Sequence, residues 1–311
     1  MDNKILGLHH ITAIAGNAKR NYEFYTNVLG LRMVKKTVNF DDPGTYHFYF
    51  GDESGTPGSI LTFFPWEGIG LGQVGTGMAT EIGYSVPAGS LAFWAERFNR
   101  FKVKQGDIKE MFGEQTLLFA DPDGLKIKLI EPAGEDHRTP WKTSEVAATE
   151  ALKGFHSIVL TLKSIKATAE ILTEVFGYRL LQQEENRYRF ITDAIENAAI
   201  VDLVETPDGG RGINAAGTNH HVAFRVRNEE ILMNFREKIA ARGLGITPKI
   251  DRDYFFSLYF REPGGVLFEL ATDNPGFATD ETVAELGSSL RLPKQYEASR
   301  VQIEAQLPKL S

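Results

Sequence analysis

The sequence predicts an α+β fold built from four copies of one βαβββ module. A pattern of strand, amphipathic helix and further strands recurs about every 70 residues along the chain. Glycine follows the predicted helix in three of the copies, as Gly30, Gly177 and Gly243, and glycine in this place is a helix stop signal. Two Pro/Gly turns, at 121–124 and 262–265, match each other, and each leads into a final strand.

The elements of each module are predicted from hydrophobic periodicity. In the first module, Tyr22, Tyr25 and Leu29 share one face of the predicted helix. The first two modules comprise strands at 7–15, 32–40, 46–50, 59–64, 80–86, 116–120 and 125–130, with helices at 19–29 and 90–101. The last two comprise strands at 154–158, 199–204, 219–224, 246–250, 255–260 and 266–270, with helices at 166–176 and 229–241.

Two segments lie outside the modules. Residues 136–152 are polar, contain Pro140 and are predicted to link a pair of modules at 1–135 to a pair at 153–273. The tail at 274–311 has helical propensity around 281–286 and 297–307. One interpretation is a lid over the body, although a solvated C-terminal helix would show the same pattern.

The composition limits the classes of protein to which the chain can belong. With 311 residues, 42% hydrophobic and 24% charged, the chain is typical of a soluble globular protein. A net charge of -7 argues against partners such as nucleic acid or an anionic membrane. Cysteine is absent, which excludes disulfides, thiolate metal sites and thiol nucleophiles, so any metal must be held by nitrogen and oxygen. Met1 to Lys4 lead directly into a strand without a signal peptide or membrane span, so we expect a cytoplasmic location.

Aligning the modules brings chemically distinct residues to two shared positions. On the first strands the equivalent residues are His10, Glu81, Ser157 and His221. On the final strands they are Lys128, Asp202 and Glu269, with Thr62 or Phe63 in the first module. Only modules one and four together supply two histidines and a carboxylate.

A carboxylate in the apolar run 264–270 requires a cationic neighbour, because burying an uncompensated charge costs several kcal/mol. Strand alternation places the members of each histidine pair on opposite faces, and the module alignment favours His10 and His221 over His9 and His220. Two histidines with Glu269 match the ligand set of non-haem Fe(II) oxygenases.

The remaining polar candidates carry weaker signals. Histidines on strands are usually structural, and we assign His47, His137 and His156 to that class. Arg252 and Tyr259 flank one strand of the fourth module and could donate hydrogen bonds to a bound oxygen anion.

These motifs resemble those of the vicinal oxygen chelate superfamily, which includes glyoxalases, extradiol dioxygenases and antibiotic-resistance proteins. The segments at 8–12, 50–58, 154–157, 220–224 and 263–269 resemble in particular the hydroquinone-type ring-cleaving dioxygenases, among them dichlorohydroquinone dioxygenase. The resemblance covers nearly the whole chain.

The resemblance implies a fold of two cup-shaped mixed β-sheets, with a metal site in the cup that modules one and four build. It implies that His10, His221 and Glu269 hold Fe(II), with Mn(II) as an alternative. It also implies second-shell and substrate-contacting roles for a further set. These residues are His9, His220, Arg252 and Tyr259, expected to serve catalysis, and Thr12, expected to bind substrate.

The function we expect is an extradiol-type dioxygenase that opens a hydroquinone-like or catechol-like ring with O2. Its partners are a small aromatic substrate and O2, and a homo-oligomer is left open. One alternative is a glyoxalase-like isomerase of a thiol adduct, which should use a fuller ligand shell with zinc or nickel. Another is a non-catalytic binder of a quinone or drug, which needs no metal triad.

Overall fold

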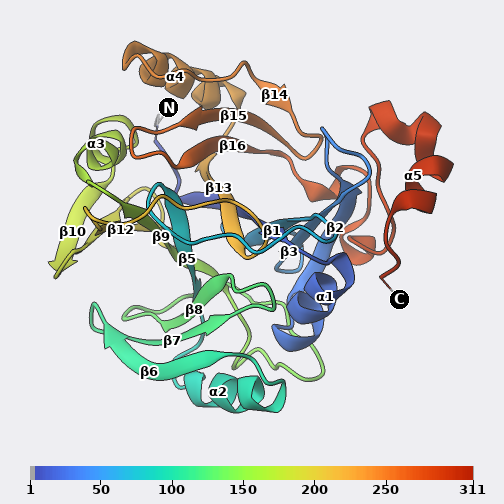
Figure 1. Cartoon of the computed structure of the whole chain (residues 1–311), viewed down its shortest axis with the longest axis horizontal. Coiled ribbons are helices and arrows are strands. Elements are labelled where there is room, and N and C mark those ends of the chain that lie inside the picture. Colours follow the sequence, from blue (N-terminus) through green and yellow to red (C-terminus); the bar gives the residue numbers. More distant parts are fainter. Residues whose placement is uncertain (1–3, 311) are drawn as a thin grey trace.

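The computed structural model describes residues 4–310, and within them one order of elements occurs four times (Figure 1). Residues 1–3, on which the expectation about the N-terminal segment falls, and residue 311 of the predicted tail lie outside the described residues. The first module comprises β1 (Leu8–Ala15), α1 (Ala18–Glu23), the π-helical turn η1 (Phe24–Val28), β2 (Arg32–Val38), β3 (Tyr46–Gly51) and β4 (Ile60–Pro65). The second comprises β5 (Met78–Ser85), α2 (Leu91–Arg100), β6 (Gln105–Met111), β7 (Glu114–Ala120) and β8 (Lys126–Glu131).

The second half of the chain repeats this order. The third module comprises β9 (Gly154–Leu162), α3 (Lys166–Glu170), the π-helical turn η2 (Ile171–Val175), β10 (Arg179–Glu184), β11 (Arg187–Ile191) and β12 (Ile200–Glu205). The fourth comprises β13 (Thr218–Val226), α4 (Glu229–Ala241), β14 (Ile250–Asp251), β15 (Phe255–Arg261) and β16 (Leu267–Pro275). The fourfold βαβββ order predicted from the sequence is therefore confirmed.

Some elements differ from the sequence prediction. Strands β6, β10 and β11 were not predicted, and β6 and β10 are mostly exposed, so they lack the apolar alternation that marks a half-buried strand. The strand predicted at 246–250 is reduced to β14 and an isolated bridge between Ile246 and Phe260.

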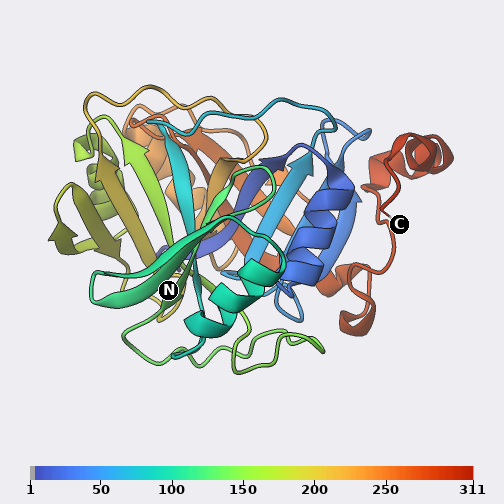
Figure 2. The same ribbon diagram turned by 60° about the horizontal axis from the view of Figure 1, so that its bottom comes forward.

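Each sheet combines one module from the first half of the chain with one module from the second half. The first sheet has the strand order β14-β15-β16-β13-β1-β4-β3-β2, and the second has β10-β11-β12-β9-β5-β8-β7-β6. Both are curled, mixed sheets of eight strands, and Figure 2 shows their curvature. The antiparallel pairs β1 with β13 and β5 with β9 join the modules at the centre of each sheet. The cup formed by modules one and four is thus confirmed, while the domain limits at 1–135 and 153–273 stay a prediction.

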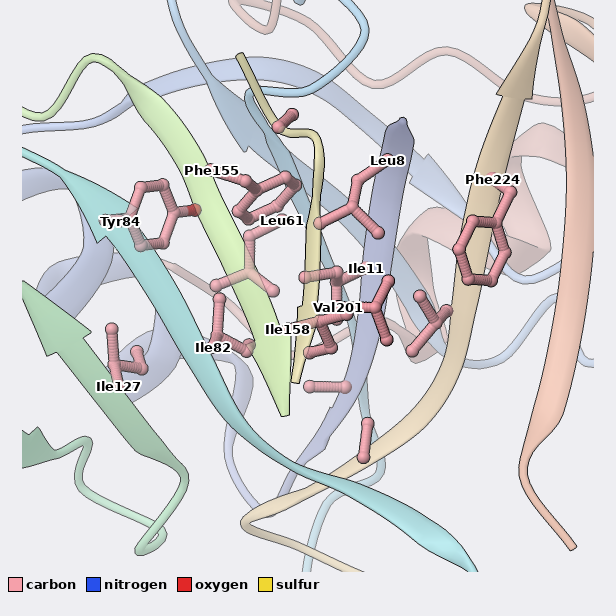
Figure 3. Close-up of a cluster of buried hydrophobic side chains, with 14 of the residues drawn as sticks. Leu8, Ile11, Leu61, Ile82, Tyr84, Ile127, Phe155, Ile158, Val201 and Phe224 are labelled. Atoms are coloured by element: carbon pink, nitrogen blue, oxygen red, sulfur yellow. The ribbon is translucent and has the colours of Figure 1, made fainter. Parts of the chain in front are cut away.

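The main hydrophobic core lies between the central strands of the two sheets (Figure 3). Leu8 and Ile11 of β1 and Phe155 and Ile158 of β9 point into it, and all four side chains are fully buried. Each such side chain stabilises the fold by roughly 1.5–3 kcal/mol relative to exposure. This core covers the convex faces of the central strands, so their concave faces are free to carry polar groups.

The C-terminal tail packs beside β2. It comprises η3 (Phe277–Thr279), η4 (Val283–Glu285), η5 (Lys294–Ser299) and α5 (Arg300–Gln306). The fully buried Lys35 Nζ of β2 lies 2.6 Å from Asp280 Oδ1 and 2.5 Å from Glu281 Oε2. Leu292, Ile303 and other tail residues also pack on β2. The tail therefore covers an edge strand, which would otherwise expose unpaired backbone groups.

In residues 4–310, the structure has no helix of the length and apolarity needed to cross a membrane.

Candidate metal centre

Three predicted side chains converge on the concave face of the first sheet. His10 Nε2 lies 3.2 Å from Glu269 Oε2, and His221 Nε2 lies 2.9 Å from the same oxygen. One nitrogen or oxygen from each residue falls within 4.8 Å of the others. All three are buried, and Glu269 is fully so. Among the described residues, no other cluster of histidine and acidic side chains meets in this way.

The strand pairing explains how the first and last modules supply this set. β1 and β13 are antiparallel neighbours, and β13 is parallel to β16. Ala223 pairs with both His10 and Glu269, and His221 lies two residues before Ala223, so the three ligands lie on adjacent strands and on one face of the sheet. Such pairing joins residues from opposite ends of the chain without a flexible connection.

Two β-bulges place the other histidines of the two pairs. The register between β1 and β13 skips one residue at His9 and one at His220, so each of these is an extra residue in its strand. As a result Leu8 and Ile11, three positions apart, both face the core, whereas uniform alternation would place them on opposite faces. The expected alternation within each histidine pair therefore fails, and both rings of a pair come together.

Hydrogen bonds of His9 determine the tautomer of His10. His9 Nε2 lies 3.1 Å from the carbonyl oxygen of Thr272, which only accepts, so Nε2 carries the hydrogen. Burial and the neighbouring His10 lower the pKa of His9 well below its usual range, so the ring is neutral and its Nδ1 is an acceptor. That Nδ1 lies 2.9 Å from His10 Nδ1, which must therefore donate. His10 Nε2 is left with its lone pair directed at Glu269 and the centre.

His220 makes a similar contact on the other side of the centre. Its Nδ1 lies 2.8 Å from Nδ1 of His221. Burial and His221 lower the pKa of His220 to about 3, so the ring is neutral at physiological pH. Unlike His9, it lines the cavity in front of the centre, and no backbone carbonyl within the described structure accepts from its second nitrogen.

The arrangement fits a bound cation. Ser257 Oγ donates to Glu269 Oε1 at 2.5 Å, while Glu269 Oε2 and His221 Nε2 are buried without a hydrogen-bond partner of acceptable geometry despite lying 2.9 Å apart. Burial raises the pKa of Glu269, but His10 and His221 lower it more, and the net shift is well below the usual range. An ionised, fully buried carboxylate with an unpartnered oxygen facing two imidazoles is suited to a divalent metal ion.

A cavity of about 370 Å³ opens in front of this centre. Its walls combine aromatic rings with a few polar groups, as in small-molecule sites. The residues that line it include His10, Thr12, Phe40, His47, Tyr49, Phe64, Trp66, His220, His221, Arg252, Phe255 and Tyr259. None of the described tail residues, 276–310, is among those that line the cavity, so the tail does not form the lid considered from the sequence.

Arg252 and Tyr259 form one polar wall of the cavity. Arg252 Nε donates to the hydroxyl oxygen of Tyr259 at 3.3 Å. Burial and Glu269 raise the pKa of Tyr259, and although burial lowers the pKa of Arg252, Tyr259 and Glu269 raise it more. The guanidinium is therefore cationic and the phenol protonated, so the Tyr259 hydroxyl carries a hydrogen that it can donate.

His47, for which the sequence predicts a structural role, also lines the cavity. Its Nε2 is 3.0 Å from Thr62 Oγ1 and its Nδ1 is 3.0 Å from the Tyr49 hydroxyl. Thr62 Oγ1 lies in turn 2.8 Å from Thr12 Oγ1. A sequence signal existed, because His47 and Tyr49 share the strand face opposite to the fully buried Phe48.

The second sheet shows what replaces the centre in modules two and three. Its strands repeat the bulges, with Thr80 and His156 as the extra residues. Gly83 pairs with Ser157 and Lys128 just as Ala223 pairs with His10 and Glu269, which confirms the module alignment. Lys128 Nζ lies 2.9 Å from Glu81 Oε2. In the second sheet, the ammonium group of a lysine therefore stands where the first sheet could hold a metal ion.

The same pairing decides the equivalent position in module one. Thr12 pairs with Thr62, so Thr62, and not Phe63, is equivalent to Glu269. The first sheet therefore offers three protein ligands and a threonine.

The fold and this centre define a protein of the glyoxalase and dioxygenase class. The family model described as Glyoxalase/Bleomycin resistance protein/Dioxygenase superfamily matches residues 7–129 and 154–270, and the chain belongs to this superfamily. The superfamily inferred from the sequence motifs is thus confirmed.

Individual relatives show which members of the superfamily this chain is similar to. A protein of Bacillus subtilis strain 168, named "Putative ring-cleaving dioxygenase MhqO", is 47% identical over 306 residues, covering 98% of this chain and 96% of that protein. Chlorohydroquinone/hydroquinone 1,2-dioxygenase of Sphingobium indicum is 33% identical over 305 residues, covering 96% and 94%. A crystal structure of a protein described as a putative dioxygenase from Bacillus subtilis superposes with a TM-score of 0.95 at 45% identity, covering 99% and 98%. The names of these relatives support ring-cleaving dioxygenase chemistry.

Proposed function

We propose that this protein is an Fe(II)-dependent dioxygenase that opens a hydroquinone-like or catechol-like ring with O2. The observation that carries the proposal is the meeting of His10, His221 and Glu269 at the base of a cavity with aromatic walls. The names of the relatives favour a dihydroxybenzene over a thiol adduct. We further propose that the bond cleaved is next to a hydroxyl-bearing carbon, as in extradiol-type cleavage.

The three ligand residues would hold the metal through His10 Nε2, His221 Nε2 and Glu269 Oε2. Three protein ligands leave coordination positions open for small molecules, as in the facial triad of non-haem iron oxygenases. Bound Fe(II) would supply the one-electron chemistry that O2 needs to react with a closed-shell ring. Mn(II) has similar ligand preferences and is the alternative metal.

The residues of the chain itself would orient the ring and move protons. Phe64, Trp66 and Phe255 form apolar walls for a planar ring, in a volume suited to one small ligand. Arg252 holds the Tyr259 hydroxyl, which can donate to an oxygen that gains negative charge during cleavage.

His220 is the residue we propose as a hydrogen-bond donor to a substrate oxygen, because a metal on His221 Nε2 leaves His221 Nδ1 to donate to His220 Nδ1 and keeps the hydrogen of the neutral His220 ring on Nε2. It lines the cavity, and its second nitrogen has no backbone partner among the described residues. Both nitrogens of His9 are engaged, by Thr272 and His10, and His9 does not line the cavity. We therefore propose a positioning role for His9 in place of the catalytic role expected from the sequence.

Oxygen consumption tests this proposal. Protein loaded anaerobically with Fe(II) should consume O2 with methylhydroquinone or catechol, and the aromatic absorbance of the substrate should disappear. His221→Ala is the matched control and should be inactive. No uptake with any dihydroxybenzene would contradict the proposal, and turnover of a hemithioacetal without O2 would favour an isomerase instead.

A further inference from the structure

A hydrogen-bonded chain of four side chains runs along the cavity wall, where three of its members line the cavity and Thr62 lies behind them. It runs from the Tyr49 hydroxyl to His47, from His47 to Thr62 and from Thr62 to Thr12, with separations of 3.0, 3.0 and 2.8 Å. Tyr49, Thr62 and Thr12 are at most 2% exposed. Thr12 lies two residues from His10, and the two share the concave face of β1. It is therefore beside the place where a ligand of the metal centre would bind.

The chain can be polarised in only two directions. Burial, followed by His10 and His221, lowers the pKa of His47 well below its usual range, so its ring is neutral, with one donor and one acceptor nitrogen. Either Tyr49 donates at one end and Thr12 keeps a free hydrogen, or Thr12 donates and Tyr49 keeps one.

The surroundings of Tyr49 favour the first direction. Its ring packs against Phe277 at 5.2 Å and Tyr254 at 6.3 Å, and among the described residues the hydroxyl has His47 as its one hydrogen-bond partner. Of the three hydroxyls in this hydrogen-bonded chain, the phenol of Tyr49 is the most acidic, and an imidazole nitrogen is its best acceptor. Donation from Tyr49 to His47 is therefore a stronger bond than donation from His47 to Tyr49. Each following bond is then polarised in the same sense.

We propose that Tyr49, His47 and Thr62 form a relay that makes Thr12 a hydrogen-bond donor to an anionic oxygen of the bound ligand. Tyr49, His47 and Thr62 are positioning residues in this scheme, and Thr12 makes the contact. The relay selects an ionised phenol over a neutral hydroxyl that must itself donate. This deepens the proposed function, on which it rests for the identity of the ligand class.

Thr62 offers the sharpest test because it alone of the four does not line the cavity, so it can affect a ligand only through its partners Thr12 and His47. The probe is 4-nitrocatechol, whose visible absorption reports the ionisation and hydrogen bonding of its oxygens. It is titrated anaerobically into Fe(II)-loaded protein, without turnover. Thr62→Val and Tyr49→Phe should each weaken binding about tenfold, the usual effect of losing one hydrogen bond to a charged group, and shift the band of the bound phenolate to longer wavelength.

Matched variants separate the relay from packing. Thr62→Ser keeps the hydroxyl and should bind the probe as the wild type does. Tyr46→Phe makes the same change as Tyr49→Phe on the opposite face of β3, where Tyr46 stacks on Phe48, and should have no effect. The double variant Thr12→Val/Tyr49→Phe should be no weaker than Thr12→Val alone, because both changes remove one donor.

The inference is overturned if Thr62→Val and Tyr49→Phe keep the wild-type affinity and spectrum, if Thr62→Ser is as impaired as Thr62→Val, or if the wild type does not bind the probe. If the probe shows the expected pattern but no dihydroxybenzene drives O2 uptake, the proposed function fails while the relay stands.

Discussion

His9 Nε2 and the carbonyl oxygen of Thr272 lie 3.1 Å apart, and this bond ties the first strand of the chain to the strand that carries Glu269. Through the second contact of His9, at 2.9 Å, it also fixes which nitrogen of His10 bears a hydrogen. The ligand set is thus oriented by a residue that does not line the cavity.

Replacing His9 by alanine should weaken metal binding about 10- to 100-fold, the usual effect of removing a partner of a ligating histidine. The cause is that His10 would no longer be held in the tautomer with a free Nε2 lone pair. Competitive titration with a chelating dye measures the affinity. His137→Ala, at an exposed histidine, is the control. An affinity of His9→Ala equal to that of the wild type would contradict the assignment of this tautomer.

Tyr259→Phe should lower kcat by about 10²- to 10³-fold, the range for loss of one donor to a developing oxyanion, while metal content stays unchanged. Steady-state oxygen uptake at saturating substrate measures the effect, with metal analysis in parallel. Arg252→Lys should have a similar but smaller effect, because it keeps the charge and loses the oriented Nε donor. If Tyr259→Phe changes KM alone, Tyr259 contributes to ground-state binding and not to the chemical step.

Lys35→Met should destabilise the protein by on the order of 3 kcal/mol, because it leaves the fully buried Glu281 without its lysine partner. The loss should be concentrated in the tail, where Asp280 and Glu281 bind Lys35. Limited proteolysis and thermal unfolding measure both effects. Lys36→Met, on the neighbouring residue of β2, is the control. Equal protease resistance of the two variants would show that the ion pair does not hold the tail.

Acid should weaken the second sheet through Glu114. Burial raises the pKa of Glu114, but hydrogen bonds from His156 and Arg189 lower it to about 2, against an ordinary value of 4.5. Because the pKa is depressed in the folded state, the stabilisation is present above pH 4.5 and is lost as the pH falls towards 2. The difference in unfolding free energy between wild type and Glu114→Gln should therefore shrink from pH 5 to pH 3. A constant difference would mean that the pKa of Glu114 is the same in the folded and the unfolded protein.

Much of the fold could be predicted because the repeated module is visible as a repeated pattern in the sequence. Each module has a strand, a helix with a glycine stop and a final strand, and the doubled histidines occur at matching places. Strands β6 and β10 could not be predicted in this way, since most of their side chains are exposed and both faces read as polar.

The candidate centre could also be located from the sequence, but its second layer of contacts could not. Uniform alternation separates His9 from His10, whereas the bulge at His9 brings their rings together. Leu8 and Ile11, apolar and three positions apart around the pair, were the sequence signal of that bulge. The place of His47 in the cavity wall was not predicted, because its contact with Thr62 depends on how β3 pairs with β4, which the local sequence does not encode.

Metal analysis of His10→Ala is the most direct test of the central claim, that modules one and four together build one metal site. Wild-type protein loaded anaerobically with Fe(II) and desalted should retain about one equivalent of iron per chain, since the described residues offer one such ligand set. His10→Ala should retain almost none and consume no O2 with methylhydroquinone, while its thermal unfolding without metal stays close to that of the wild type. Full iron retention and activity in His10→Ala would contradict the account, because the site would then not depend on the first strand.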